Sequence, residues 1–61
     1  MTITMERHRL RDAAGNRYTL EIIRTHGRYE VRMDGKFYAA AESIAEAEDE
    51  IFDIVSTNRL M

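Results

Sequence analysis

The chain has 61 residues and a formal net charge of −2, and it contains no cysteine and only two histidines. This length allows one small domain, residues 1–61, with a small core. The composition excludes disulfides and thiolate metal sites. No apolar run is long enough to span a membrane, and the first residues lack the order of a signal peptide. We therefore expect a soluble, cytoplasmic protein.

Charge is distributed unevenly along the chain. Residues 1–36 carry eight basic and five acidic side chains, whereas residues 37–61 carry Arg59 against six acids. The first part is therefore basic and the second part acidic. The negative total charge argues against non-specific binding to nucleic acid, but it leaves room for a basic face.

The first segment, from about residue 2 to residue 11, predicts an irregular strand. Ile3 and Met5 share one side of an extended chain, whereas His8 and Leu10 share the other. A β-bulge near Glu6–Arg7 would bring both pairs onto the core face. Without a bulge, one pair would be exposed.

Two segments with alternating apolar and polar residues predict a hairpin. They cover residues 17–25 and 28–33, and the residues between them are His26-Gly27. A two-residue turn there fixes the register, and a slip by one residue would place apolar side chains opposite charged ones. The predicted apolar pairs are Ile22 with Val31 and Leu20 with Met33.

The segment after Asp34-Gly35 permits two interpretations. We favour a three-residue loop with Gly35 left-handed and a fourth strand, because Gly-Lys-Phe-Tyr is typical of a strand. The alternative is that residues 37–42 form the start of the helix, because their alanines favour helix. The strand interpretation predicts that Phe37 lies beside Val31 and Ala39 beside Tyr29.

A capping box predicts that the helix begins after Ser43, with Glu46 bonding back to the cap. An apolar stripe at helical spacing follows, and Asn58 is expected to end the helix with Leu60 or Met61 folding back. The fold class is therefore α+β: a three- or four-stranded antiparallel meander packed on one face by a single C-terminal amphipathic helix. The stripe consists of Ile44, Ala47, Ile51, Ile54 and Val55.

Catalytic chemistry is not indicated. The glycines are isolated turn residues rather than a phosphate-binding loop, and there is neither a His-Glu-x-x-His motif nor a cysteine nucleophile. Ser43 and Ser56 have no evident histidine and aspartate partners. We therefore expect a non-catalytic protein without catalytic, cofactor-binding or metal-binding residues.

Acidic residues form a ridge on the exposed side of the predicted helix. Its spacing includes like-charge pairs four residues apart, which destabilise a helix, and no lysine relieves them. We expect this acidic ridge to dock onto a basic surface of a partner protein, one that normally receives nucleic acid. Such a protein would be a small inhibitor or adaptor of a phage or mobile element. The alternative is a solvated face that maintains solubility. The acidic ridge comprises Glu42, Glu46, Asp49, Glu50 and Asp53.

The side of the sheet away from the helix is expected to be rich in arginine. The competing function is nucleic-acid binding by this side, and the alternative is cross-strand ion pairing, with Glu21 between Arg7 and Arg32. The order of elements resembles the three-strand-plus-helix DNA-binding domains of plant transcription factors and phage integrases, which implies DNA binding through the sheet but identifies no site residue. The candidate residues are Arg9, Arg11, Arg17, Arg32 and Tyr38.

An apolar patch is expected on the same side of the sheet. Ile23 and Tyr38 should point away from the helix, with Ala40 nearby. An apolar strand at a sheet edge invites pairing with another chain. These three residues therefore predict a homodimer through the fourth strand.

Overall fold

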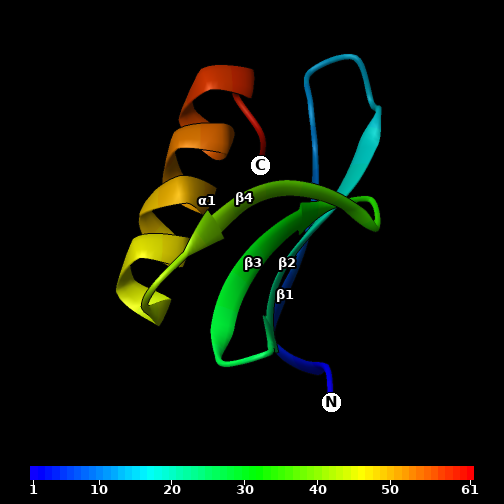
Figure 1. Ribbon diagram of the computed structural model, residues 1–61. Coiled ribbons are helices and arrows are strands. Elements are labelled where there is room, and N and C mark those ends of the chain that lie inside the picture. Colours follow the sequence, from blue (N-terminus) through cyan, green and yellow to red (C-terminus); the bar gives the residue numbers. More distant parts are fainter.

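Alternating apolar and polar residues fold the first two thirds of the chain into four consecutive strands. The computed structural model describes all 61 residues. The strands lie in the order β1-β2-β3-β4, each antiparallel to the next, and one helix packs against the sheet (Figure 1). This arrangement confirms the predicted α+β meander and shows that residues 37–41 form a fourth strand rather than the start of the helix. The elements are β1 (Ile3–Arg11), β2 (Arg17–Thr25), β3 (Arg28–Met33), β4 (Lys36–Ala41) and α1 (Ile44–Asn58).

The core lies between the sheet and the apolar stripe of α1. Only 9 of the 61 residues are buried. Burial of one large aliphatic side chain stabilises a fold by about 1.5–3 kcal/mol, so few side chains provide most of the stabilisation. Of the predicted stripe, Ile44 and Val55 are partly exposed, whereas the other three residues are buried. The core cluster consists of Leu20, Ile22, Val31, Ala41, Ala47, Ile51, Ile54 and Leu60.

The hairpin of β2 and β3 has the predicted register. Ile22 lies opposite Val31 and Leu20 opposite Met33. The two turn residues, His26 and Gly27, both have positive φ, of 53° and 74°. This conformation matches the right-handed twist of the paired strands, which explains why two residues are enough to connect them.

The hairpin of β3 and β4 differs from the prediction. Asp34 and Gly35 form a two-residue turn with φ of 53° and 81°, instead of a three-residue loop. A β-bulge follows, because Arg32 lies opposite Phe37 but Val31 lies opposite Ala39, which leaves Tyr38 unpaired. The expected pairing of Phe37 with Val31 is therefore wrong, as is that of Ala39 with Tyr29, which lies opposite Ala41.

This register turns Phe37 away from the helix. Paired residues share a face of the sheet, and Arg32 alternates with the core residue Val31. Phe37 is accordingly 63% exposed, whereas Ala41 is 5% exposed beneath the helix. The register shift thus exchanges a large aromatic side chain for small alanines on the side that α1 covers.

Strand β1 has a bulge of the predicted kind, but at another residue. Thr4 lies opposite Ile23 and Glu6 opposite Ile22, so Met5 is unpaired rather than Glu6–Arg7. Leu10 packs against the core as expected, whereas Ile3 and Met5 remain 48% and 40% exposed. They are exposed because α1 approaches β2, β3 and β4 but not β1.

Both ends of α1 are held by local hydrogen bonds. The Ser43 hydroxyl accepts from the Glu46 N–H at 3.1 Å, but the Glu46 side chain does not form the reciprocal hydrogen bond of the capping box. At the other end Arg59 is left-handed (φ 52°), and the Leu60 N–H donates to the Val55 carbonyl at 3.0 Å. This returns Leu60 to the core, as predicted.

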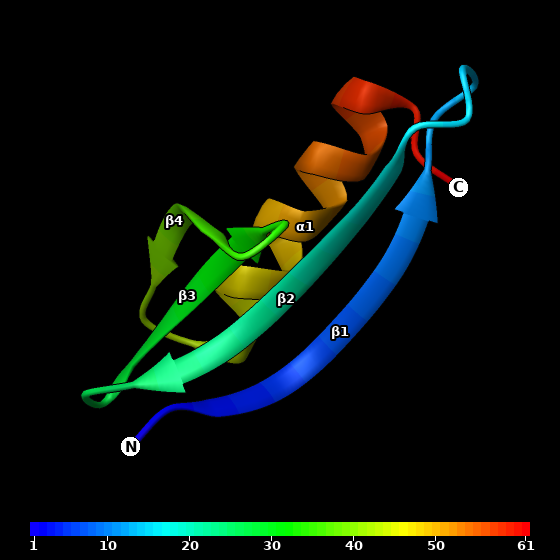
Figure 2. The same ribbon diagram turned by 90° about the vertical axis from the view of Figure 1, so that its right-hand side faces the viewer.

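The last residue extends the sheet by one backbone pair. The N–H and carbonyl of Met61 exchange hydrogen bonds of 2.9 Å with those of Arg11. In Figure 2 the C-terminus accordingly lies beside the end of β1 that is close to the β1–β2 loop. The free edge of β1 is thereby closed at this end, while the rest of the edge stays open.

Candidate functional site

The face of the sheet that points away from α1, called the outer face below, is open. In Figure 2 this face is in front and α1 lies behind it. The strand register places six arginines and two glutamates on it, so the outer face is basic although the whole chain is acidic. These residues are Arg7, Arg9, Arg11, Arg17, Arg28 and Arg32 with Glu21 and Glu30.

Both glutamates of the outer face already hold an arginine. The Glu21 carboxylate binds Arg7 at 3.1 Å, and the Glu30 carboxylate binds Arg32 at 3.3 Å. The expected ladder is therefore only half formed: Glu21 lies opposite both Arg7 and Arg32, but Arg32 turns to its own strand. Ion pairing accounts for Arg32 and leaves the other predicted arginines of this face unexplained.

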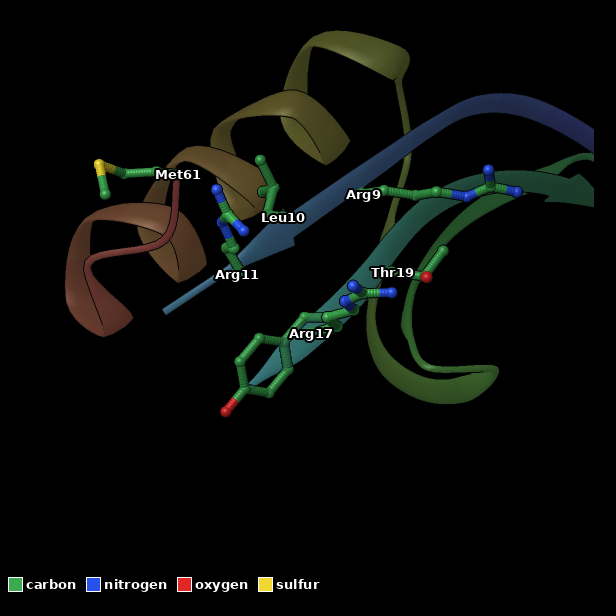
Figure 3. Close-up of a pocket in the computed structure, with 7 residues that line it drawn as sticks. Arg9, Leu10, Arg11, Arg17, Thr19 and Met61 are labelled. Carbon is green, nitrogen blue, oxygen red and sulfur yellow. The ribbon is translucent and has the colours of Figure 1, made fainter. Parts of the chain in front are cut away.

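Arg9, Arg11 and Arg17 gather without any acidic partner. Arg11 lies directly opposite Arg17 across the β1–β2 pair, and like charges in this position destabilise a sheet. The three arginines line a shallow hollow of about 330 Å³ at the end of the hairpin, together with Thr19 and Met61 (Figure 3). In Figure 3 Arg9, Arg17 and Thr19 extend toward the same side. We call Arg9, Arg11 and Arg17 the arginine cluster.

The carboxylate nearest to the cluster in sequence is engaged elsewhere. Asp12 accepts hydrogen bonds from the Asn16 side chain at 3.1 Å, from the Asn16 and Ala14 N–H groups at 2.9 Å, and from the Tyr18 hydroxyl at 3.2 Å. These bonds, that of the Asn16 side chain first, hold the pKa of Asp12 below its ordinary value. Asp12 therefore organises the β1–β2 loop as an anion and forms no ion pair with Arg11 or Arg17.

A second hollow lies at the opposite end of the outer face, next to the β2–β3 turn. It has a volume of about 390 Å³. The sequence predicts Phe37 beside the core residue Val31, so Phe37 is a surface residue that the sequence analysis missed. The preference of Asp-Gly for two-residue turns was the signal that could have revealed it. The residues around this hollow, called the Phe37 hollow below, are Thr25, His26, Arg28, Glu30, Phe37 and Ala40.

The acidic ridge lies in the helix layer. Four of its five members are exposed and Glu50 is half-buried. None of the five forms an ion pair. Charge that was separated along the sequence is thus separated in space, with arginine on the sheet and carboxylates on the helix. The ridge residues are Glu42, Glu46, Asp49, Glu50 and Asp53.

The predicted apolar patch is smaller than expected. Ile23 lies on the outer face as predicted, but it is only 3% exposed, because it sits on an inner strand between Thr4 and Glu30. Tyr38, the unpaired residue of the bulge, is 49% exposed, and Ala40 is also exposed. The accessible apolar surface of β4 is therefore made by Phe37, Tyr38 and Ala40.

A third cluster of titratable groups lies between β1 and the side of α1 that faces it. The His8 ring lies 3.0 Å from the Glu6 carboxylate, and this contact holds the pKa of Glu6 below its ordinary value. Glu48 faces Glu6, and their shared hydrogen bond raises the pKa of Glu48. No three histidine, aspartate or glutamate side chains converge as a metal site would require.

Comparisons with known proteins add no assignment. No protein-family model matches the chain, and no curated protein or solved structure shows significant similarity to it. The only helix, α1, is shorter and more polar than a membrane-spanning helix has to be.

Proposed function

We propose that this protein is a non-catalytic binding module whose outer face binds the phosphate backbone of nucleic acid. The arginine cluster is the observation that carries the proposal. Its three guanidinium groups have no acidic partner, and two of the arginines, Arg11 and Arg17, occupy directly paired positions of β1 and β2, where like charges lower the stability of a sheet. A phosphate group between them would turn this repulsion into attraction.

The chemistry of the cluster suits phosphate. A guanidinium group is always charged and donates two parallel hydrogen bonds to phosphate oxygens. Arg9 and Arg11 lie on one face of β1 two residues apart, which separates them by about 7 Å along the strand. The cluster therefore offers an extended row of donors, as a chain of phosphates requires, and the acidic helix repels a polyanion from the other side of the molecule.

Fluorescence anisotropy with a labelled oligonucleotide tests this proposal. The triple variant Arg9→Gln/Arg11→Gln/Arg17→Gln should lose most of the affinity. If each arginine contacts one phosphate of a single strand, the slope of log affinity against log salt should fall by about 2. The folded state should tolerate the variant, because it removes like-charge repulsion.

A matched control removes three positive charges that lie away from the outer face, in Arg24→Gln/Lys36→Gln/Arg59→Gln. Its affinity should stay close to that of the wild type at moderate salt. Equal losses in both variants would mean that total charge, and not the arginine cluster, governs binding. Absence of binding by the wild-type protein at low salt would refute the proposed function.

The acidic ridge supports a second candidate function, docking onto a basic surface of a partner protein as a small inhibitor or adaptor. The observation that favours it is that none of the five carboxylates forms an ion pair. An affinity pull-down from source cells, with nuclease added, tests it. A partner retained by the wild type should be lost with Asp49→Asn/Glu50→Gln/Asp53→Asn and retained with Glu48→Gln. A partner that still binds the ridge variant as well as it binds the wild type would refute this candidate.

A further inference from the structure

Phe37 is a large aromatic side chain that the fold leaves exposed on the outer face. The two-residue turn and the bulge at Tyr38 place it on the outer face, opposite Arg32, where its side chain is 63% exposed. Water contact with a large aromatic ring forgoes the stabilisation that burial would provide. Of the other residues of β4, Tyr38 is 49% exposed at the bulge but does not line the Phe37 hollow, whereas the small side chain of Ala40 lies beside Phe37 in it.

The surroundings of this ring provide polar groups of several kinds. The Phe37 hollow is lined by Thr25, His26 and Arg28, whose side chains carry a hydroxyl, an imidazole ring and a guanidinium group. Its volume of about 390 Å³ lies within the range of small-molecule sites. The Glu30 carboxylate at its edge is already held by Arg32 at 3.3 Å, so its charge is partly neutralised. An aromatic face with donors and an acceptor beside it matches the needs of a nucleobase, which stacks by its face and hydrogen-bonds by its edge.

The Phe37 hollow and the arginine cluster lie on the same face at opposite ends of β2. Eight residue steps separate Arg17 from Thr25, which corresponds to about 27 Å along the strand. One nucleic-acid strand of several nucleotides along the outer face would reach both. The faces and edges of bases in a duplex are stacked and paired, so only an unpaired base would enter the hollow.

We infer that the Phe37 hollow is a base-stacking subsite and that the outer face therefore selects single-stranded over duplex nucleic acid. This inference rests on the proposed function, because the arginine cluster supplies the attraction for the backbone. It adds the class of ligand and assigns a role to a residue outside the cluster.

The test compares a labelled ten-nucleotide single strand with the same sequence as a duplex, by anisotropy at one salt concentration. The wild type should prefer the single strand. Phe37→Ala should lower single-strand affinity about tenfold, since stacking on one aromatic ring commonly contributes a factor of that order. Its affinity for the duplex should not change, and Phe37→Trp should restore the preference.

Phe52→Ala is the matched control, because Phe52 is a similarly exposed ring, at 70%, but lies on α1. It should leave both affinities unchanged. Equal binding of single strand and duplex by the wild type, or an unchanged affinity in Phe37→Ala, would overturn the subsite while leaving the proposed function intact. Loss of most of the affinity in the arginine triple variant supports that function independently.

Sedimentation velocity of the free protein distinguishes base stacking on Phe37 from self-association through β4. Wild type and Phe37→Ala should both sediment as monomers. A concentration-dependent dimer that Phe37→Ala abolishes would assign the exposed surface of β4 to self-association, and the subsite would then be refuted.

Discussion

Replacing Arg17 by glutamate should stabilise the fold and weaken ligand binding at the same time. In the wild type, Arg17 faces Arg11 across the β1–β2 pair without an acidic neighbour in contact. Glutamate at this position removes one like-charge pair and creates one opposite-charge pair. Each such pair is worth about 0.2–1 kcal/mol, and exposed side chains lie toward the lower end, so the expected gain is about 0.5–1 kcal/mol.

For a domain of this size the gain corresponds to a rise in Tm of about 2–8 °C. Thermal unfolding followed by circular dichroism measures it, at low salt and again at about 0.5 M salt, where screening should remove most of the effect. Arg17→Gln removes only the repulsion and should show about half of the rise. In the anisotropy assay, Arg17→Glu should bind oligonucleotide more weakly than Arg17→Gln.

The reasoning would be refuted if Arg17→Glu melted at or below the wild-type Tm at low salt. It would also be refuted by a gain that salt does not diminish, because the effect would then come from packing and not from charge. A variant that is more stable but binds oligonucleotide more weakly would show that the Arg11–Arg17 pair increases affinity and lowers the free energy of unfolding.

Two further predictions concern the fold. Ser43→Ala removes the acceptor of the Glu46 N–H and should lower stability by about 1 kcal/mol, whereas Ser43→Asp should keep it; an unchanged Tm in Ser43→Ala would contradict the cap. The pKa of Asp12 is lowered in the folded state, so its contribution to stability is present above the unfolded pKa and is lost as pH falls through the folded pKa. In Asp12→Asn, Tm should therefore fall less steeply than in the wild type as the pH is lowered below about pH 4. The same fall of Tm in both proteins would exclude Asp12 as its source.

The sequence predicts a strand register well where only one register separates apolar from charged residues. In the β2–β3 hairpin a slip by one residue would expose Leu20 and Ile22 and bury charges, so the pattern determines the pairing. In β4 the sequence from Phe37 to Ala41 is apolar at every position, and either register buries an apolar side chain. The choice then depends on turn geometry, which periodicity does not contain.

For the candidate site, too, the sequence predicts which face of the sheet a residue occupies but not the contacts that its side chain makes. Alternation along β1 and β2 predicts that Arg9, Arg11 and Arg17 share the outer face, as the register shows, but the sequence grouped them with Arg32 and Tyr38. The sequence does not reveal which arginines stay unpaired, because Glu21 lies opposite both Arg7 and Arg32 and pairs with only one of them. Side-chain rotamers make that choice. Phe37 was missed for a different reason, since its position follows from the register of β4.

The failure of α1 to approach β1 has a consequence for the motions of the molecule. Strand β1 is held by its ladder to β2, by the backbone pair with Met61 and by the packing of Leu10 against the core, whereas α1 packs directly across β2, β3 and β4. Regions with few buried contacts open at a lower free energy than the rest of the fold. Backbone amides of β1 should therefore exchange with solvent deuterium faster than those of β2 and β3. Arg9 and Arg11 lie on this more mobile strand, whereas Arg17 lies on the more rigid strand β2. The distance between the arginines on the two strands can therefore adjust to a ligand bound between them.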